Sequence, residues 1–260
     1  GLAQKLYEGV ALGDEGPTGL ITYMRTDSTR LSEEAMALAR EHIFENYGKE
    51  YLPKEPRRFK KGKASQDAHE AIRPTSLAQT PKAVRRYLDQ DAAQLNELIW
   101  TRVIASQMSA AEFEQLSVDV EGGEYLFRAT DQLAVFRGFL LVYDEMHDEG
   151  ASEKEEDPTS RLPEYLAHGQ MLTLNDLLPR QHFTKPPARY SESTLVKELE
   201  ALGIGRPSTY ALIVSTVVDR KYVEQKDRKL YATDLGMQVN KLLVQYFPDI
   251  LNVKFTARME

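Results

Sequence analysis

A tyrosine and an arginine stand two residues apart in residues 19–29, which read Gly-Leu-Ile-Thr-Tyr-Met-Arg-Thr-Asp-Ser-Thr. If this segment is extended, the side chains of Tyr23, Arg25 and Asp27 point to the same side. A phenol, with an ordinary pKa of about 10, is a weak nucleophile at neutral pH. A neighbouring guanidinium could stabilise a phenolate or the charge on an attacked phosphate. Spacing alone favours a simpler alternative, a strand that carries a surface tyrosine and arginine.

Residues 65–75, Ser-Gln-Asp-Ala-His-Glu-Ala-Ile-Arg-Pro-Thr, hold a second cluster. On a helix, His69 and Arg73 would be neighbours four residues apart. The cluster is not the His-Glu-x-x-His zinc signature because Arg73 replaces the second histidine, and the chain has no cysteine and five histidines. Two interpretations stay open: a histidine and an arginine that contact a phosphate, or a helix-end histidine satisfied by a nearby acid or by solvent.

Residues 203–210, Gly-Ile-Gly-Arg-Pro-Ser-Thr-Tyr, form a third cluster. Glycines before a helix N-terminus let backbone N–H groups face an anion. The side-chain donors that could join them are Arg206, Ser208 and Thr209. Spacing alone slightly favours an interhelical turn with Pro207 at the first helical position. Arg220, near the end of the same predicted helix, is by default a C-terminal charge that the helix dipole favours.

Two common phosphate and metal signatures are missing from the sequence. Residues 61–64, Lys-Gly-Lys-Ala, lack the first glycine and the Ser/Thr of a nucleotide P-loop. The one Asp-x-Asp, residues 89–91, lies between predicted helices and has a capping role available. No acidic triad follows an apolar strand in a way that would hold Mg²⁺. We therefore expect no metal site in this chain.

The net charge of −7 at first argues against a nucleic-acid partner. Residues 144–158, however, hold eight acids and one base, which account for the whole acidic excess. A basic run lies elsewhere, as a solvated loop or as a phosphate-contacting patch: Lys54, Arg57, Arg58, Lys60, Lys61 and Lys63. No apolar run approaches the roughly 18 residues that cross a bilayer. The absence of cysteine fits a cytoplasmic protein.

The elements that must position these clusters change along the chain. Residues 1–108 are predicted to be mostly helical: Ser32 caps a helix that Gly48 ends, Thr80–Pro81 opens another, and Asp91 caps a third. The third helix is predicted to bury a stripe of four side chains, Leu95, Ile99, Val103 and Met108.

Near residue 112 the hydrophobic period changes to two, which indicates strands. The predicted strands follow Leu116, Val118 and Val120 and continue over 125–130, 133–143 and 170–174, with a turn at 121–124. Helices return from Ser191 to Leu202 and from Pro207 to about Arg220. A hairpin over 222–232 and a helix from Thr233 follow, the latter with Leu235, Val239 and Leu242–Leu243 turned inward. This order is typical of a winged helix-turn-helix.

Three motifs in this order resemble bacterial type IA DNA topoisomerases, and the resemblance covers nearly the whole chain. The motifs are residues 21–29, residues 68–74, and residues 183–190 running on to 205–210. The resemblance implies that Tyr23 attacks a phosphodiester of single-stranded DNA, forming a 5′-phosphotyrosine and releasing a 3′-hydroxyl. It implies that Arg25 stabilises the phosphoryl charge and that His69 hydrogen-bonds near the scissile phosphate. The DNA-binding residues that it implies are Asp27, Arg73, Arg206, Ser208, Thr209 and Arg220.

By the same resemblance the fold class is α+β and multidomain, part of the type IA topoisomerase toroid. Residues 1–108 are expected to form the helical tyrosine-bearing domain, 109–188 part of a β-rich hinge arch, and 189–260 part of a winged-helix-like DNA-binding domain. The chain begins in a helical pattern without an initiator Met, so we expect a piece of a longer protein. The Mg²⁺ ligands are then expected in a toprim domain outside this chain, and the piece alone is expected to be inactive.

The resemblance also implies an ATP-independent enzyme that relaxes negative supercoils. Its substrate would be negatively supercoiled duplex DNA, on which it acts through a single-stranded segment. The enzyme would be a monomer in the cytoplasm with no membrane partner. Three alternatives stay open. The chain could come from a decatenating topoisomerase III or from a reverse gyrase, or it could act only as a non-catalytic module that binds single-stranded DNA.

Overall fold

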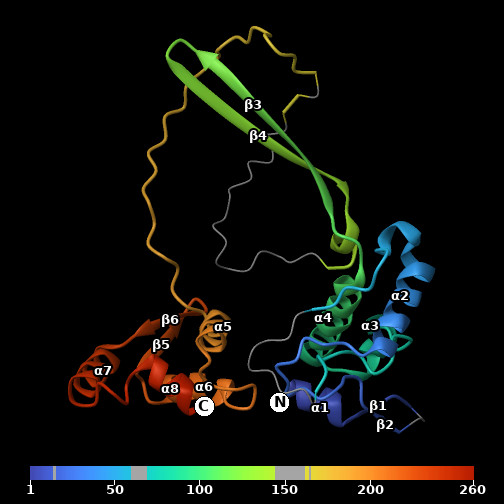
Figure 1. Ribbon diagram of the computed structural model, residues 1–260, viewed down its shortest axis with the longest axis vertical. Helices are drawn as coiled ribbons and strands as arrows, with labels where there is room; N and C mark the ends of the chain where they lie inside the picture. Colours follow the sequence, from blue (N-terminus) through green and yellow to red (C-terminus); the bar gives the residue numbers. More distant parts are fainter. Residues whose placement is uncertain (14–15, 60–68, 144–161, 164) are drawn as a thin grey trace. The chain divides into compact units, whose positions relative to one another are not determined.

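The computed structural model describes residues 1–13, 16–59, 69–143, 162–163 and 165–260 (Figure 1). Within these residues the contacts divide the chain into two compact units. Unit 1 comprises residues 1–32, 58–96 and 187–260, and unit 2 comprises residues 33–57 and 97–186. Several predicted features lie outside the described residues: Lys60, Lys61 and Lys63 of the basic run, residues 65–68 of the second cluster, and the acidic segment 144–158.

Unit 1 begins with a short helix and a two-stranded antiparallel sheet, namely α1 (Leu2–Glu8), β1 (Val10–Ala11) and β2 (Pro17–Thr18). Leu6 of α1 is fully buried, and its carbonyl accepts a 2.8 Å hydrogen bond from the N–H of Leu20. Leu20 and Ile21 are buried as well. These apolar side chains tie the segment before Tyr23 to the first helix.

The helical turns of residues 80–93 begin at polar caps. Thr80 caps α3 (Pro81–Val84), as predicted, by accepting a hydrogen bond from the N–H of Ala83. The 3₁₀ turn η3 (Arg85–Tyr87) and α4 (Gln90–Gln107) follow. The predicted cap of α4 is wrong by two residues, because Asp89 and not Asp91 accepts the N–H of Ala92, at 2.8 Å.

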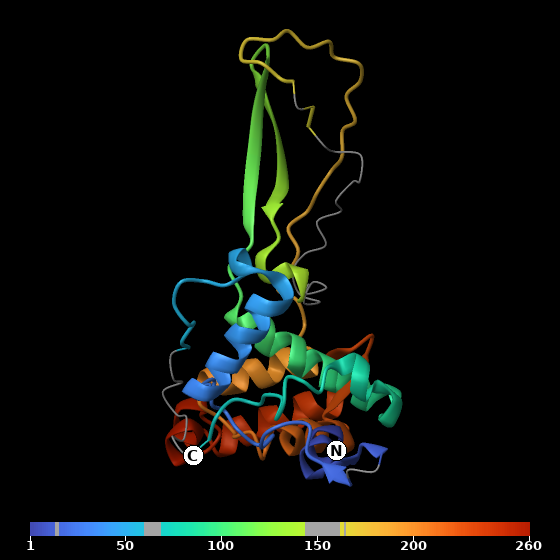
Figure 2. The ribbon, with the colours of Figure 1, turned by 90° about the vertical axis from the view of Figure 1, so that its right-hand side faces the viewer.

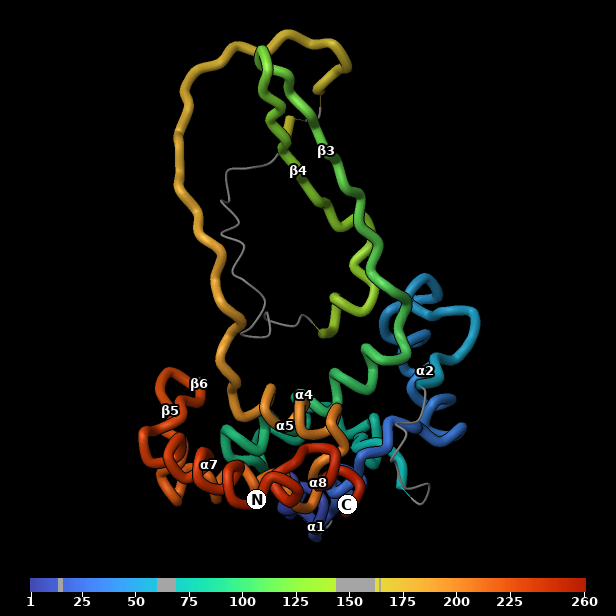
Figure 3. The backbone as a smooth tube through the Cα atoms, turned by 60° about the vertical axis from the view of Figure 1, so that its left-hand side comes forward, coloured from blue at the N-terminus to red at the C-terminus, as the bar shows by residue number. Residues whose placement is uncertain are grey.

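Residues 187–260 contain the elements that the winged helix-turn-helix pattern predicts. In chain order they are α5 (Glu192–Leu202), α6 (Tyr210–Asp219), β5 (Val223–Lys226), β6 (Lys229–Ala232), α7 (Asp234–Tyr246) and α8 (Val253–Met259), and Figure 3 follows their backbone. Ser191 and Thr194 form a capping box at α5, and Thr233 caps α7.

Two details of this segment differ from the prediction. Pro207 does not open α6, which begins three residues later, because residues 206–209 form a turn closed by a 2.8 Å bond from the N–H of Thr209 to the carbonyl of Arg206. The apolar residues of α7 do not all face inward. Leu235, Leu242 and Leu243 are exposed and Val239 is half-buried, because α7 packs little against the other described elements and has no buried residue.

Unit 2 is built on α2 (Glu33–Tyr47), the 3₁₀ turn η2 (Lys49–Tyr51) and the second half of α4. In Figures 1 and 2 the two helices lie side by side, and the rings of His42 and Trp100 meet edge to face at 5.2 Å. The spacing of Met36, Ala39, Ile43 and Tyr47 predicts that these residues share one face of α2; the first three are buried and Tyr47 is half-buried. In α4, Leu95 and Ile99 are only half-buried, and Asn96 and Trp100 take the buried positions.

A buried amide fixes the loop after η2 within unit 2. The side chain of Gln107 is fully buried; its oxygen accepts the N–H of Arg57 at 3.2 Å and its nitrogen donates to the carbonyl of Arg57 at 3.0 Å. Both polar ends of the amide are thereby satisfied, as burial requires. The loop that carries Arg57, one of the predicted basic run, is therefore held against the end of α4.

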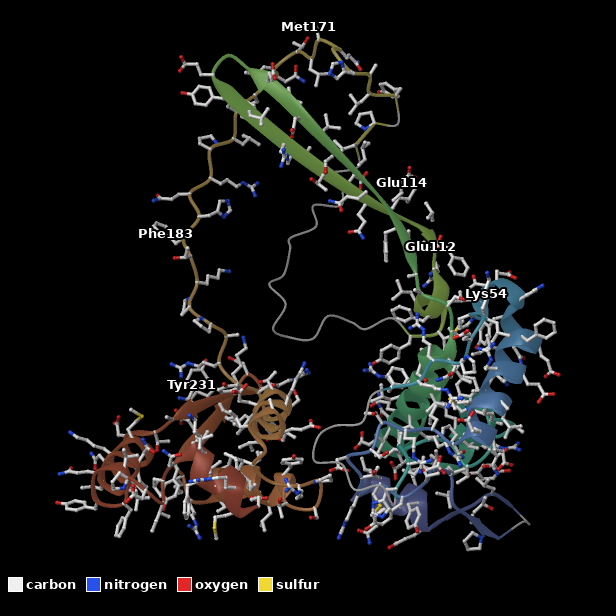
Figure 4. The ribbon with its side chains drawn as sticks, in the orientation of Figure 1. Lys54, Glu112, Glu114, Met171, Phe183 and Tyr231 are labelled. Atoms are coloured by element: carbon white, nitrogen blue, oxygen red, sulfur yellow. The ribbon has the colours of Figure 1, made fainter. Side chains whose placement is uncertain are left out.

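A long antiparallel hairpin rises from this base: β3 (Glu112–Gly122) and β4 (Tyr125–Phe136), followed by the 3₁₀ turn η4 (Gly138–Leu141). Side chains project from both of its faces (Figure 4). The predicted turn at 121–124 is confirmed, but the strand predicted over 133–143 ends at Phe136 and the strand predicted over 170–174 does not form. The latter segment has the alternating pattern but no partner strand to complete its hydrogen bonds, and Met171 is 92% exposed.

None of the helices in the described residues combines the length and the apolar composition that crossing a membrane requires.

The root of the hairpin yields a stability prediction. Gly138 has φ +48°, and a Cβ added there would collide with the backbone carbonyl of Ala110. Gly123 at the hairpin tip also has positive φ, +65°, but its Cβ would meet nothing within 4 Å. Left-handed backbone costs an alanine about 1–2 kcal/mol at either position, so Gly138→Ala should lower the Tm several degrees further than Gly123→Ala. Equal melting temperatures for the two variants would show that the Ala110 contact is not restrictive.

Candidate active site

The segment before Tyr23 is fixed by pairing with residues 71–75. The N–H of Thr22 donates to the carbonyl of Arg73 at 2.9 Å, and the N–H of Thr75 donates to the carbonyl of Leu20 at 3.1 Å. Ile21 and Pro74 form the bridge between these bonds. The hydroxyl of Thr22 adds two bonds, donating to the carbonyl of Ala71 and accepting the N–H of Arg73. The first two motifs, about fifty residues apart in sequence, are therefore held together by their backbones.

This pairing brings His69 to Tyr23. The two ring centroids are 5.2 Å apart with the planes tilted by 48°. On another side Tyr7, from α1, meets the ring of Tyr23 edge to face at 5.5 Å. Tyr23 is nevertheless 38% exposed. The arrangement holds the ring of Tyr23 between two aromatic neighbours while leaving part of the residue open to solvent.

Arg25 and Asp27 follow Tyr23 in an irregular segment. The pairing with residues 71–75 stops at Thr22, and the backbone bends at Met24 and Arg25. The regular alternation that would point Tyr23, Arg25 and Asp27 to one side is therefore not realised. The side chain of Arg25 is exposed and Asp27 is half-buried.

Arg73 is already occupied by protein partners. Its guanidinium forms two hydrogen bonds with the carboxylate of Glu70, at 3.0 and 3.1 Å, and a third with the carbonyl of Pro74 at 3.1 Å. The bond from Arg73 lowers the pKa of Glu70, against the opposing effect of burial, and the N–H of Ser32 donates to the same carboxylate. Residues 69–73 are not helical, so His69 and Arg73 are not the helical neighbours considered above.

In the loop at 203–209 the glycines serve the backbone conformation, and most of the side-chain donors are bonded to backbone carbonyls of the protein. Gly203 ends α5 in the left-handed conformation, and Gly205, with φ +79°, leaves no space for a Cβ beside the ring of Tyr210. Arg206 donates to the carbonyls of Gly205 and Glu260. The hydroxyl of Thr209 bonds to the backbone of Arg206 as both acceptor and donor.

Ser208 of the third cluster and Arg220, ten residues beyond it, are open to solvent. Ser208 lies in the turn before α6, and Arg220 ends that helix. Of the predicted DNA-binding residues in this segment, these two have the most accessible side chains.

The sequence pattern does not indicate the contact of Tyr7 with Tyr23 or the pairing of Glu70 with Arg73. Tyr7 lies sixteen residues before Tyr23 on a different element, so no local spacing indicates their contact. Gly19 offered a weak signal, because a Cβ there would lie 2.7 Å from the carbonyl oxygen of Tyr7. That position needs glycine so that the two segments can approach.

In the described part of the chain no three His, Cys, Asp or Glu side chains gather in a way that could hold a metal ion.

Comparison with known proteins places the chain in a family. The family model described as DNA topoisomerase matches residues 1–260, and the chain belongs to this family, in its bacterial type IA class. It is 47% identical over 261 residues to DNA topoisomerase 1 of two Xylella fastidiosa strains, Temecula1 and 9a5c, an alignment that covers 100% of this chain and 32% of each relative. The chain therefore spans about a third of the length of these curated relatives.

A solved structure extends the likeness to three dimensions. The chain is similar to full-length topoisomerase I from Thermotoga maritima with a TM-score of 0.74 and 34% identity, over 99% of this chain and 40% of that one. The predicted fold class, α+β and multidomain, is confirmed by this likeness.

The Glu70–Arg73 pair yields a prediction on pH. Because the folded pKa of Glu70 lies below its usual value of 4.5, the pair contributes stability that is fully present above about pH 4.5. This stability is lost as the pH falls through the lowered pKa. Glu70→Gln should therefore lower the free energy of unfolding at pH 7 and flatten its decline between pH 5 and 3, as followed by urea denaturation. Glu198→Gln, at an exposed position of α5, serves as the control, and an unchanged acid decline in Glu70→Gln would contradict the prediction.

Proposed function

We propose that this chain carries the DNA-cleaving tyrosine of an ATP-independent type IA topoisomerase that relaxes negatively supercoiled DNA. The observation that carries the proposal is the exposed ring of Tyr23 beside His69, both held by the pairing of residues 20–22 with 71–75. At Tyr210, which follows the third cluster's turn, burial and then the nearby carboxylate of Glu200 raise the pKa. A raised pKa disfavours the phenolate form of Tyr210.

The proposed reaction is a balanced exchange of two esters. The oxygen of Tyr23 attacks the phosphorus of a phosphodiester in a single-stranded segment, and a bond from oxygen to phosphorus forms. The bond from phosphorus to the 3′-oxygen breaks, and the proton that Tyr23 loses is balanced by the proton that the 3′-oxygen gains. The 5′-phosphotyrosine conserves the ester bond energy, so attack by the 3′-hydroxyl reseals the strand without ATP.

Arg25 and His69 are proposed as the groups that assist at the phosphate. A cation beside the phosphoryl oxygens stabilises the charge that develops during attack, and Arg25 is exposed two residues from the nucleophile. His69 is proposed to hydrogen-bond to the scissile phosphate. Asp27 is proposed to contact DNA beside it, and Arg73 is proposed to act mainly by holding the 69–75 segment through Glu70.

The third cluster is proposed to bind the strand beside the cleavage site. Ser208 and Arg220 have exposed side chains for this role. Arg206 and Thr209 are bonded within their own loop, so their proposed contribution includes shaping it. The proposed division into functional domains is 1–108, 109–188 and 189–260.

Mg²⁺ is proposed as the cofactor of the whole enzyme. The described residues do not offer a group of ligands for it, so its ligands are assigned to the two-thirds of the family's length that this chain does not span, and no step above passes through it. The working enzyme is proposed to be a cytoplasmic monomer. The likeness to proteins named DNA topoisomerase 1 favours a relaxing enzyme over the decatenating alternative.

The decisive test removes the oxygen of Tyr23 in a full-length family member that contains this chain. Tyr23→Phe keeps the ring and its contacts with Tyr7 and His69, so the fold should persist and covalent attachment of protein to the 5′ end of a labelled cleaved strand should fall to background on a denaturing gel. Tyr7→Phe is the matched control, because it removes the phenol oxygen of the residue that contacts Tyr23 and should leave the adduct yield unchanged. A normal adduct yield from Tyr23→Phe would exclude Tyr23 as the nucleophile.

Arg25→Ala tests charge stabilisation in the same enzyme. The nucleophile remains, and loss of one oxyanion-type donor costs roughly 10²–10³ in rate, so single-turnover cleavage should slow by that factor while DNA affinity changes little. His69→Ala should slow cleavage less. If Arg25→Ala instead weakens DNA binding and leaves the single-turnover rate unchanged, Arg25 binds the substrate in its ground state and does not act on the transition state.

A further inference from the structure

An arginine lies over a tyrosine ring at the β5–β6 hairpin, outside the three clusters. The guanidinium carbon of Arg189 lies 4.5 Å from the centroid of the Tyr231 ring. Tyr231 belongs to β6, and Figure 4 labels it where the chain leading to α5 reaches the hairpin. The N–H of Leu230 donates to the carbonyl of Tyr190 at 2.7 Å, so the backbone next to Arg189 is tied to the strand that carries the ring.

This contact places the guanidinium over the ring without using its hydrogen-bond donors. A guanidinium has five N–H donors in its plane, and a cation over a ring face is held by the π-electrons and leaves those donors at the edge. Arg189 is exposed and forms no ion pair with any carboxylate in the described part of the chain. Its charge therefore remains available to an external anion.

The second cation at this ring is different. The ammonium of Lys226 lies 6.0 Å from the centroid of Tyr231, but it is paired with Glu224 at 2.6 Å. Its charge is balanced within the hairpin. Arg189 is therefore the group at this ring that best fits a phosphate, whose oxygens match the spacing of guanidinium donors.

We propose that Arg189, oriented by Tyr231, binds a backbone phosphate of single-stranded DNA. The identity of the ligand rests on the proposed function, which makes DNA the substrate, whereas the site rests on the geometry of Arg189, Tyr231 and Leu230. The site is distinct from the loop at 203–209 and adds a contact to the hairpin.

The test measures the affinity of the 260-residue chain for a fluorescent oligothymidylate across a salt series. Each phosphate neutralised on a single strand contributes a slope of about −0.7 in log affinity against log salt. Arg189→Ala should therefore make the slope shallower by about 0.7 and weaken binding roughly fivefold at 0.1 M salt. Arg128→Ala is the charge-matched control, because Arg128 is already paired with Asp119 at 2.6 Å, and it should leave the slope unchanged.

Variants of Tyr231 test the orientation of the arginine. Tyr231→Phe keeps the ring face and should bind DNA as the parent does. Tyr231→Leu keeps the charge of Arg189 but removes the ring beneath its guanidinium. This second variant should weaken binding with little change in the salt slope. An unchanged slope for Arg189→Ala, or an equal change for Arg128→Ala, would overturn the site. Tyr23→Phe should not alter this slope, so the failure of covalent cleavage and the failure of this contact are separate results.

Discussion

The backbone pairing of residues 20–22 with residues 71–75 is the contact on which the candidate site depends. It joins two segments that are far apart in sequence through main-chain bonds and the hydroxyl of Thr22. Those bonds set the distance between the rings of Tyr23 and His69, and the buried Leu20 and Ile21 anchor the pair to the core of unit 1. The ion pair of Glu70 and Arg73 stabilises the conformation of residues 69–75. Without the pairing, the side chains of Tyr23 and His69 would lie on unconnected loops.

Local signals predicted the elements well where local physics decides them. The predicted helix starts at Thr80–Pro81, Ser191 and Thr233 and the predicted turn after Gly122 follow from side-chain and glycine chemistry within a few residues. The failures share a different cause. Residues 170–174 have the pattern of a strand but no partner strand, and the buried face of α4 turned out to hold Asn96 and Trp100 because neighbouring elements, and not helix periodicity alone, choose which face is covered.

The sequence allows the residues of the candidate site to be proposed, but it does not give their contacts. Tyr23 and His69 could be named from their motifs, but their proximity, the role of Tyr7 and the occupation of Arg73 by Glu70 depend on tertiary placement. The helical relation considered for His69 and Arg73 was wrong because residues 71–75 are engaged as an extended pairing partner. Inferring that residues four apart are neighbours presumes a helix. In this segment the tertiary pairing with residues 20–22 makes the backbone extended instead.

The buried amide of Gln107 restricts which residues can replace it during evolution. Its oxygen accepts from the backbone N–H of Arg57 and its nitrogen donates to the backbone carbonyl of the same residue. The side chain is not exposed to water. A glutamate lacks the donor, a methionine lacks both groups, and an asparagine is one methylene too short. Each replacement leaves a polar group of the loop without its partner in a dry interior. Descendants of this sequence are therefore expected to keep glutamine there, or to change the loop and the helix end together.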